Sequence, residues 1–569
     1  MIVGIDLGTT NSLVSLWRDG GVTLVPNALG HLLTPSAVGL DDDGRMLVGL
    51  AARERLSTHP ALTAATFKRL MGTDRPTILG ERSYRPEELS ALVLRALKAD
   101  AETFLGEMVT EAVITVPAYF NDTQRKATKA AGELAGLAVN RLLTEPTAAA
   151  LAYGIEAEAD EELLLVVDLG GGTFDVSLLH RFDGVMEVRA AAGDSWLGGE
   201  DFVDAIVAAF MAERGAGLPP LSRPAPVHAA LRRQAELAKR TLSEKDETVL
   251  SVIHDGEPVE WRLHRSRFES IAEPVVARLR APIERALRDA RVDPDSLSRI
   301  VLAGGASRMP IFRRLIARLF RRLPVMHINP DEVVARGAAV RAGLVERGAG
   351  LDEVVMTDVA PFTLGIEVAT RRGPRNNVRL DGLFLPIIER NTVVPASRSE
   401  MVSTVEDDQK AVSLRVYQGE ARLVKDNIAL GQLSVAVPQN PAGAEQVEVR
   451  FTYDSSGLLE VEAQVASTGH RDRLVIEGNP GLLGKEEIAR RLAALADLKV
   501  HPRDDLAVRT LLARAERLFE ERLGEVRAAI GEAMEILMLA LERQDPDEIG
   551  RARTDLAEMV AELDDTFFL

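Results

Sequence analysis

The segment VVDLGGGTFD, Val166–Asp175, joins an apolar run to an aspartate and then to three consecutive glycines. The apolar run is typical of a buried strand. Glycine lets the backbone approach other groups closely and adopt positive φ, so a strand that ends in this way presents bare N–H groups to an anion. The aspartate cannot face phosphate without a cation between them. The segment therefore predicts a magnesium-bound nucleotide rather than a bare phosphate ester.

The same design occurs at the N-terminus, in GIDLGTTNS, Gly4–Ser12. One such turn is weak evidence, because most glycine-rich turns are only turns. Two of them, Asp6 to Thr10 and Asp168 to Thr173, indicate a duplicated hairpin that grips one polyphosphate from both sides. A third glycine turn, in VLAGGASRMP, opens a helix that Pro310 would start well. Taken alone, that third turn is explained equally well as a simple connection from strand to helix.

Composition limits the classes of protein. A chain of 569 residues is too long for one core, so two or more domains are expected. The net charge of -18 argues against a nucleic-acid surface, although local basic patches stay open. The absence of cysteine excludes disulfides and cysteine nucleophiles and suits a reducing compartment. We find no signal peptide and no apolar run long enough to span a bilayer, so we expect a cytoplasmic protein with no membrane contact.

Hydrophobic periodicity divides the chain into three kinds of segment. Up to about residue 350, short apolar strands alternate with long helical patterns, which indicates an α/β fold. From about Ala360 the alternation becomes two-residue, as in VEVRFTY, and predicts a half-buried antiparallel β meander. After about Pro480 the apolar residues return to helical spacing.

The stretch GAGLDEVVMTDVAP, Gly348–Pro361, separates the first two segments and carries apolar Val354, Val355 and Met356. Exposed apolar residues need a docking surface, so we expect a moving linker. A plain buried connector is the alternative. In AELAKRTLS, four polar residues share one helix face, namely Glu236, Lys239, Arg240 and Ser243. The plainer interpretation of that face is a solvated surface with an internal ion pair.

Together these phrases resemble the 70-kDa heat-shock chaperone family of the DnaK type, whose ATPase belongs to the actin and sugar-kinase superfamily. The matching phrases run in order through nearly the whole chain and include IDLGTTNS, VPAYFNDTQR, TEPTAAALAYG, VVDLGGGTFDVS, GDSWLGGEDF, AKRTLS, AGGASRMP, NPDEVVARGAA, DVAPFTLGIE, RNTVVP and STVEDDQKAVSLRVYQGE. The resemblance implies a duplicated actin-like α/β ATPase domain (1–350), a linker (351–360), an antiparallel β-sandwich for peptide binding (361–480) and a short α-helical lid (481–569).

The resemblance also implies a nucleotide site for ATP or ADP. The residues implied at the phosphates and in the neighbouring loop are Gly8, Thr9, Thr10, Asn11, Gly170, Gly171, Gly172, Gly198 and Gly199. Those implied around adenosine are Glu236, Lys239, Arg240, Ser243, Gly304, Gly305, Arg308 and Asp331. Lys68 and Thr173 would reach the γ-phosphate, Glu145 and Asp175 would orient the attacking water, and Asp6 and Asp168 would meet Mg²⁺ largely through water. The family also uses K⁺, near Asp175.

For the peptide groove the resemblance implies Leu364, Ile366, Val402, Val412 and Leu414, with Ala369 and Val405 arching over the peptide. The linker from Val354 to Thr357 would dock on the ATPase when ATP is bound, and Pro117, Arg125, Arg141 and Asp358 would couple that state to the groove. Expected partners are unfolded or extended polypeptides, a J-domain co-chaperone received at Arg141, and a nucleotide exchange factor. We expect a monomer that binds no nucleic acid.

Some positions depart from the family pattern. Val402 stands where Phe is frequent, Ala306 replaces a Ser, and Trp196 replaces a His. The short lid segment is most similar to the bacterial HscC subfamily. The expected function is an ATP-dependent chaperone that couples ATP hydrolysis to binding and release of apolar segments. An ATPase that regulates one dedicated client is the alternative, while the linker and the β meander argue against a sugar kinase or an actin-like filament protein.

Overall fold

The computed structural model describes residues 1–56, 58–139, 141–154, 161–222, 226–255, 257–348, 351, 355–372, 378–454, 457–476, 506–522 and 524–565. The chain forms two compact units. The first comprises Met1–Thr363 with Glu389–Val394 and Ser455–Gly457, and the second comprises Leu364–Ile388, Pro395–Asp454 and Leu458–Leu569. The sequence borders at 350, 360 and 480 stay predictions.

The first sheet of the first unit has the strand order β11-β10-β1-β2-β3, with β4 paired to β2. Its strands are β1 (Ile2–Asp6), β2 (Asn11–Arg18), β3 (Gly21–Val25), β4 (Thr34–Pro35), β10 (Glu111–Val116) and β11 (Leu142–Thr144). An antiparallel meander, β1 to β3, is extended by parallel strands on the side of β1.

The second sheet repeats this plan, in the order β17-β12-β13-β14-β18-β21. Its strands are β12 (Glu161–Leu169), β13 (Phe174–Phe182), β14 (Val185–Asp194), β17 (Arg299–Ala303), β18 (Val355–Val359) and β21 (Val393–Val394). The meander β12 to β14 again has a parallel strand, β17, beside its first strand. The duplicated hairpin predicted from the two glycine turns is confirmed.

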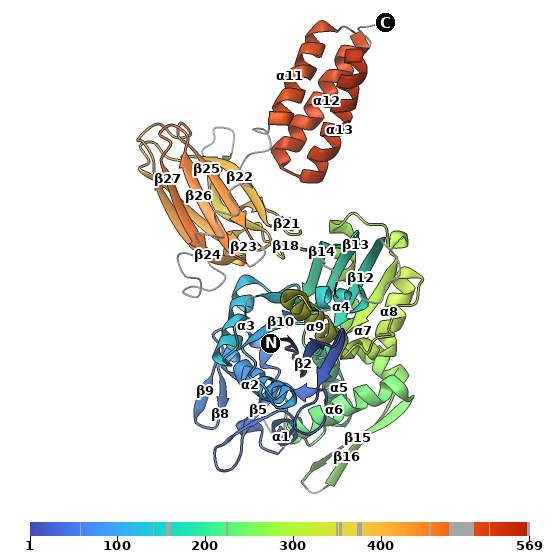
Figure 1. Cartoon of the computed structure of the whole chain (residues 1–569). Coiled ribbons are helices and arrows are strands. Elements are labelled where there is room, and N and C mark those ends of the chain that lie inside the picture. Colours follow the sequence, from blue (N-terminus) through green and yellow to red (C-terminus); the bar gives the residue numbers. More distant parts are fainter. Residues whose placement is uncertain are drawn as a thin grey trace. The chain divides into compact units, whose positions relative to one another are not determined.

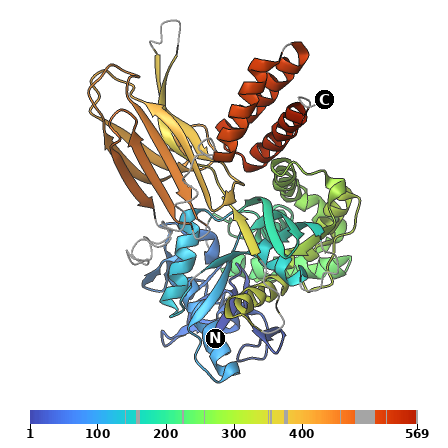
Figure 2. The ribbon, with the colours of Figure 1, turned by 45° about the horizontal axis from the view of Figure 1, so that its top comes forward.

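Helices cover both sheets of the first unit (Figures 1 and 2). They are α1 (Leu50–Arg55), α2 (Pro86–Leu105), α3 (Asp122–Leu134), α4 (Glu145–Gly154), α5 (Gly199–Arg214), α6 (Pro226–Glu244), α7 (Arg265–Asp289), α8 (Pro310–Phe320) and α9 (Val333–Glu346). Pro310 opens α8, as the sequence predicted. Asn121 caps α3 by accepting the backbone N–H of Gln124, whose side chain returns a bond to the Asn121 N–H.

Short strands and 3₁₀ turns complete the first unit. The strands are β5 (Ala37–Leu40), β6 (Met46–Val48), β7 (Thr63–Ala65), β8 (Thr77–Leu79), β9 (Arg82–Tyr84), β15 (Glu247–His254) and β16 (Glu257–His264). The turns are η1 (Pro60–Leu62), η2 (Phe67–Leu70), η3 (Pro294–Ser296) and η4 (Gly305–Arg308). Two of these turns, η2 and η4, carry residues that the sequence assigned to the nucleotide site.

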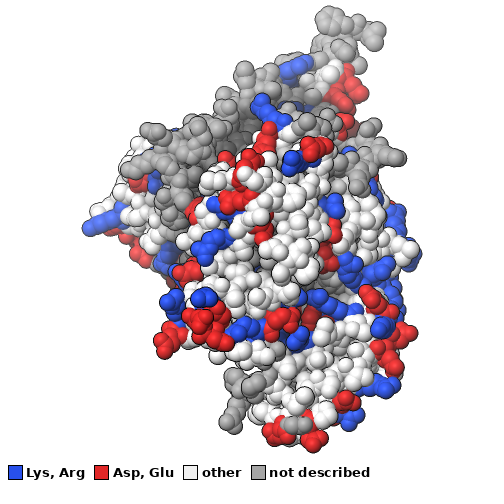
Figure 3. Space-filling view, turned by 60° about the horizontal axis from the view of Figure 1, so that its bottom comes forward, with Lys and Arg blue, Asp and Glu red and all other residues white. Residues whose placement is uncertain are grey.

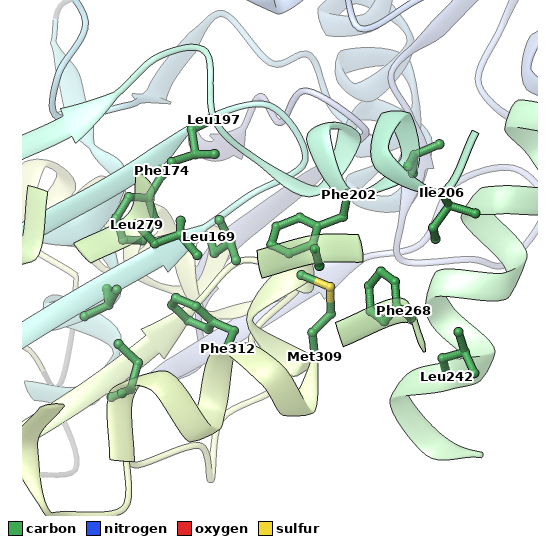
Figure 4. Packing of buried hydrophobic residues seen from close by; sticks show 14 of the residues in the cluster. Leu169, Phe174, Leu197, Phe202, Ile206, Leu242, Phe268, Leu279, Met309 and Phe312 are labelled. Atoms are coloured by element: carbon green, nitrogen blue, oxygen red, sulfur yellow. The ribbon is translucent and has the colours of Figure 1, made fainter. Parts of the chain in front are cut away.

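The largest core cluster lies between the second sheet and the helices α5 to α8. Figure 4 shows several of its aromatic residues, among them Phe174 of β13, Phe202 of α5 and Phe312 of α8. The rings of Phe174 and Phe312 meet edge to face with their centroids 6.2 Å apart. Another cluster joins α4 and α9 to strands of both sheets. The two halves of the duplication are therefore tied together by α4 and α9.

The second unit contains two four-stranded antiparallel sheets, β20-β19-β23-β24 and β22-β25-β26-β27. Their strands are β19 (Leu364–Arg372), β20 (Val378–Ile388), β22 (Ala396–Ser403), β23 (Ala411–Gln418), β24 (Ile428–Ala436), β25 (Gln446–Tyr453), β26 (Leu459–Val465) and β27 (Arg471–Ile476), with the turn η5 (Val424–Asp426). Exposed and buried residues alternate along β23, and β25 pairs antiparallel with β26, which confirms the predicted meander.

Three further helices of the second unit pack around a core of their own. They are α11 (Leu506–Glu521), α12 (Gly524–Arg543) and α13 (Pro546–Asp565). The first part of the predicted lid, 481–505, lies outside the described residues. Among the described helices, none is both long and apolar enough to cross a membrane. Basic and acidic side chains are interspersed over the face shown in Figure 3.

The aromatic core predicts the cost of truncating Phe312. Its side chain is fully buried, so Phe312→Ala should destabilise the first unit by about 3–5 kcal/mol through lost burial and a residual cavity. The exposed Leu323, at 85% of its free surface, is the control: Leu323→Ala should change stability by less than about 0.5 kcal/mol. Urea unfolding followed by circular dichroism measures both. Equal midpoints for the two variants would contradict this assignment of the core.

Candidate functional site

A cavity of about 520 Å³ opens inside the first unit, where the two glycine turns, α6 and the turn η4 converge. Most of the nucleotide-site residues predicted from the sequence line it. They are Asp6, Gly8, Thr9, Thr10, Asn11, Lys68, Glu145, Asp168, Gly170, Gly171, Thr173, Gly199, Glu236, Lys239, Arg240, Ser243, Gly304, Gly305, Arg308 and Asp331. The other three are not part of the wall: Gly172 and Gly198 each precede a wall residue in the chain, and Asp175 pairs with the wall residue Asp168 across β12 and β13.

The two glycine turns meet each other. A Cβ on Gly171 would lie 1.9 Å from the Thr10 hydroxyl oxygen, so only glycine permits this approach. The backbone N–H of Gly199, at the start of α5, donates to the Gly170 carbonyl at 2.9 Å. The N-terminus of a helix favours anions, because its first N–H groups lack partners within the helix. The turns and α5 therefore form one surface suited to phosphate.

Four acidic side chains gather beside the turns, namely Asp6, Glu145, Asp168 and Asp175. Burial, followed by the charge of Glu145, raises the pKa of Asp6 and that of Asp175 to about 7. Burial and Glu145 also raise the pKa of Asp168 well above its ordinary value. The three aspartates are costly to ionise, because burial and a charged neighbour both disfavour the carboxylate. The cavity therefore holds more potential negative charge than its own cations balance.

Specific contacts orient these groups. The ammonium of Lys68, from η2, lies 2.7 Å from a Glu145 oxygen and is only 3% exposed. The Thr115 hydroxyl donates to Asp6 at 3.1 Å. The backbone N–H of Tyr119 donates to Asp175 at 2.9 Å. Asp168 and Asp175 are directly opposite each other on β12 and β13.

The acidic groups of the cavity outnumber its cationic groups, and this surplus of negative charge is suited to binding a magnesium ion. Mg²⁺ prefers oxygen ligands and keeps several waters, with the remaining positions filled by carboxylates and substrate phosphates. Among the described residues there is no group of three or more His, Cys, Asp or Glu arranged to hold a metal by themselves. Asp6 and Asp168, both in the wall, match an ion held partly by water and by phosphate.

The far end of the cavity is lined by α6 and by the loop that contains η4. Glu236 forms an ion pair with Lys239 at 2.6 Å and accepts a hydrogen bond from Arg240 at 2.6 Å. The Lys239 ammonium also donates to the Gly199 carbonyl at 3.1 Å. Burial alone would raise the pKa of Glu236, but Lys239 and Arg240 outweigh it and lower the pKa. The polar face predicted on this helix thus forms part of the cavity wall.

The second half of this end is the third glycine turn. Gly304 has a positive φ of 77°, and a Cβ there would lie 2.4 Å from an Asp168 oxygen, so the turn passes directly behind the acidic cluster. The guanidinium of Arg308 donates to Asp331 at 2.8 Å. The turn thus does more than connect a strand to a helix, because it closes the cavity.

Several wall residues were not predicted from the sequence. They are Leu13, Leu33, Glu244, Ala306, Met309, Arg313, Met326, Pro330 and Val334; of these only Ala306 had been noted, as a departure in the adenosine turn. Most of them are apolar or stand outside any phosphate-binding pattern, so the sequence did not indicate that they line the cavity. Arg313 could have been predicted, because it lies on the first turn of α8, directly after the third glycine turn.

The predicted linker forms a strand in this unit. In β18, Val355, Met356 and Thr357 pair in parallel with Val185, Met186 and Glu187 of β14. The Val355 side chain is 56% exposed, whereas Met356 packs against the core cluster around α4 and α9. Val354 lies outside the described residues.

The other predicted coupling residues lie on several elements. Burial raises the pKa of Asp358, and the charge of Arg125 opposes that rise. The Arg125 guanidinium donates to the carbonyls of Phe120 and Ala118. Pro117 is buried after β10, while Arg141 is exposed. Arg390, counted with this unit, pairs with Asp289 of α7 at 2.8 Å.

The predicted peptide-groove residues lie on both sheets of the second unit. Leu364 and Ile366 of β19 and Val412 and Leu414 of β23 are buried in one sheet. Val402 lies on β22 of the other sheet and is half-buried, as are Ala369 and Val405. Their role in peptide binding stays a prediction.

Comparison with known proteins agrees with this geometry. The profile of the family described as Hsp70 protein matches residues 2–78 and 75–566. The chain is 44% identical over 506 residues to "Chaperone protein DnaK" of Thermotoga neapolitana, covering 86% of this chain and 82% of that one, and equally to that of Thermotoga petrophila. The DnaK of Thermosipho melanesiensis is 43% identical over 491 residues, covering 84% and 80%. With the duplicated sheets, the meeting glycine turns and this match along nearly its whole length, the chain belongs to the Hsp70 family.

Proposed function

We propose that this protein is an ATP-dependent molecular chaperone that hydrolyses ATP to ADP and phosphate and couples the reaction to binding and release of extended apolar polypeptide segments. The observation that carries the proposal is the cavity in which two glycine turns meet beside buried carboxylates and Lys68. The curated relatives are named as chaperones, which supports the same activity. No observation favours a dedicated regulator of one client.

The residues of the chain act mainly by positioning. The glycine turns and the start of α5 present N–H groups to the phosphates, and Lys68, fixed by Glu145, supplies a positive charge where the γ-phosphate would lie. Thr173 lies in the wall beside the same phosphates, and Glu145 and Asp175 orient water and accept its proton. Phosphoryl transfer needs positioning and charge neutralisation more than covalent help, so these groups suffice.

Asp6 and Asp168 would hold Mg²⁺, largely through water, and we place a K⁺ ion near Asp175 as in the family. When bound, the metal supplies positive charge that neutralises phosphate oxygens. A cation held there would also oppose the effects that raise the pKa of Asp6, Asp168 and Asp175. Binding of the nucleotide with its metal would therefore stabilise the cluster of carboxyl groups, which is unfavourable in the free protein.

Coupling to peptide runs through β18. Because β18 pairs with β14, a movement of the second sheet would also move β18. The chain continues directly from β18 to β19, the first strand of the β-sandwich. An extended peptide in that sandwich would gain main-chain hydrogen bonds and an apolar pocket from the predicted groove residues. We further propose a J-domain partner at Arg141, a nucleotide exchange factor, a cytoplasmic location and a monomeric state. The short lid favours an HscC-like subfamily.

Lys68 offers the most direct test of the catalytic assignment. Lys68→Ala should lower kcat by roughly 100-fold, about 3 kcal/mol, because it removes a preorganised positive charge from the site of phosphoryl transfer. Lys245→Ala is the control, since that side chain is exposed in the same unit. Phosphate release under saturating ATP measures both. Wild-type turnover by Lys68→Ala would refute the assignment.

The raised carboxyl pKa values predict proton release on nucleotide binding. In the free protein Asp6 titrates at about 7, so it is partly protonated at pH 7, whereas a nearby cation favours its ionised form. Binding of preformed Mg·ADP should release on the order of one proton at pH 7 and fewer as the pH rises above 8, and affinity should fall as the pH drops through 7. Calorimetry in two buffers of different ionisation enthalpy measures the release, which Asp6→Asn should reduce. Binding with no proton change at pH 7 would contradict the prediction.

The β18 register predicts which linker side chain matters. Met356→Asp should abolish stimulation of ATP turnover by an extended apolar peptide, because it buries a charge in the cluster where Met356 packs. Val355→Asp should have a much smaller effect, since Val355 is 56% exposed. Basal turnover should persist in both. Equal losses of stimulation in the two variants would rule out Met356 as the linker side chain through which coupling runs.

A further inference from the structure

One cationic side chain of the cavity wall has no acidic partner within the described part of the chain. Four of the five cations in the wall are bound by carboxylates: Lys68 by Glu145, Lys239 and Arg240 by Glu236, and Arg308 by Asp331. The guanidinium of the fifth, Arg313, has no hydrogen-bond or ion-pair partner among the residues that the structure describes. A guanidinium has five donors and no acceptor, so it is suited to a ligand that supplies acceptors or a flat π face.

The position of Arg313 follows from the start of α8. The turn η4 leads through Met309 into the helix, and the backbone N–H of Arg313 donates to the Met309 carbonyl at 3.1 Å. The neighbouring Arg314 pairs instead with Glu269 of α7 and is not part of the wall. Two adjacent arginines on one helix thus have different surroundings, and only the first reaches the cavity.

The cavity has two chemically distinct ends. The glycine turns, the acidic cluster and Lys68 form the end suited to phosphates. Arg313 belongs with η4 and α6 at the other end, where Met309 and Met326 add apolar surface. In a nucleotide bound with its phosphates at the turns, the part that reaches this end is the base.

We propose that Arg313 is a further base-binding residue. Its guanidinium contacts the purine of the bound nucleotide and does not contact the phosphates. This inference rests on the proposed nucleotide site. Purine rings offer both ring-nitrogen acceptors and a π face, and Arg engages either one. Since the Arg313 side chain is exposed, its contribution is modest, roughly two- to fivefold in affinity.

The test compares nucleotide with a ligand that has no base. Calorimetric titration gives the Kd of Mg·ADP and of Mg·tripolyphosphate for the full-length wild type, Arg313→Ala and Arg313→Gln. Both variants should bind ADP roughly two- to fivefold more weakly and tripolyphosphate as the wild type does. Arg314→Ala, the matched control, should leave both constants unchanged. In ATP turnover the Arg313 variants should raise KM and leave kcat unchanged, because the contact is the same in the ground and transition states.

Two results would overturn the proposal: unchanged ADP affinity, or an equal loss for ADP and tripolyphosphate, which would place the guanidinium at the phosphates. Unchanged tripolyphosphate binding also shows that the variants fold, and Arg313→Gln keeps the stem of the side chain if truncation disturbs α8. A wild type that fails to bind Mg·ADP would refute the nucleotide site itself, and that outcome is distinct from failure of the Arg313 assignment.

Discussion

The crowding of Asp6, Glu145, Asp168 and Asp175 around the single ammonium of Lys68 is the constraint on which this molecule is built. Buried carboxylates repel one another and lose hydration, which raises the pKa of Asp6, Asp168 and Asp175. Burying and crowding carboxylates costs free energy, and a bound ligand of opposite charge can offset that cost. Here a cation and a polyphosphate would do so together, which explains why acid and bare backbone occur side by side.

The duplication decides where that cluster lies. Each half contributes one meander whose first strand ends in an aspartate and a glycine turn, and the helices α4 and α9 tie the halves together. Because the turns meet at Gly171 and Thr10, both aspartates come to the same cavity although they are far apart in the chain. Small changes at this contact would alter both walls of the site at once.

The predicted linker lies in the first unit as the strand β18. As β18 it extends the second sheet through main-chain pairing, and Met356 adds apolar contact. Main-chain pairing is largely independent of side-chain identity, which is why a segment of Val, Met and Thr can lie between β14 and β21. Asp358, at the acidic end of this segment, is half-buried, and the charge of Arg125 opposes the rise of its pKa.

Sequence alone determined the fold class and the two glycine turns, because strand periodicity and glycine turns are local signals. Most of the cavity wall was predicted only through the resemblance to the Hsp70 family. Sequence alone could not decide that α6 faces the cavity rather than solvent, since the spacing of Glu236, Lys239 and Arg240 is the same in both cases. Nor could it separate Arg313 from Arg314, or Val355 from Met356, because adjacent residues differ only in what packs against them. Those choices belong to the tertiary structure, which alone sets the distances and the burial that shift a pKa or leave a cation without a partner.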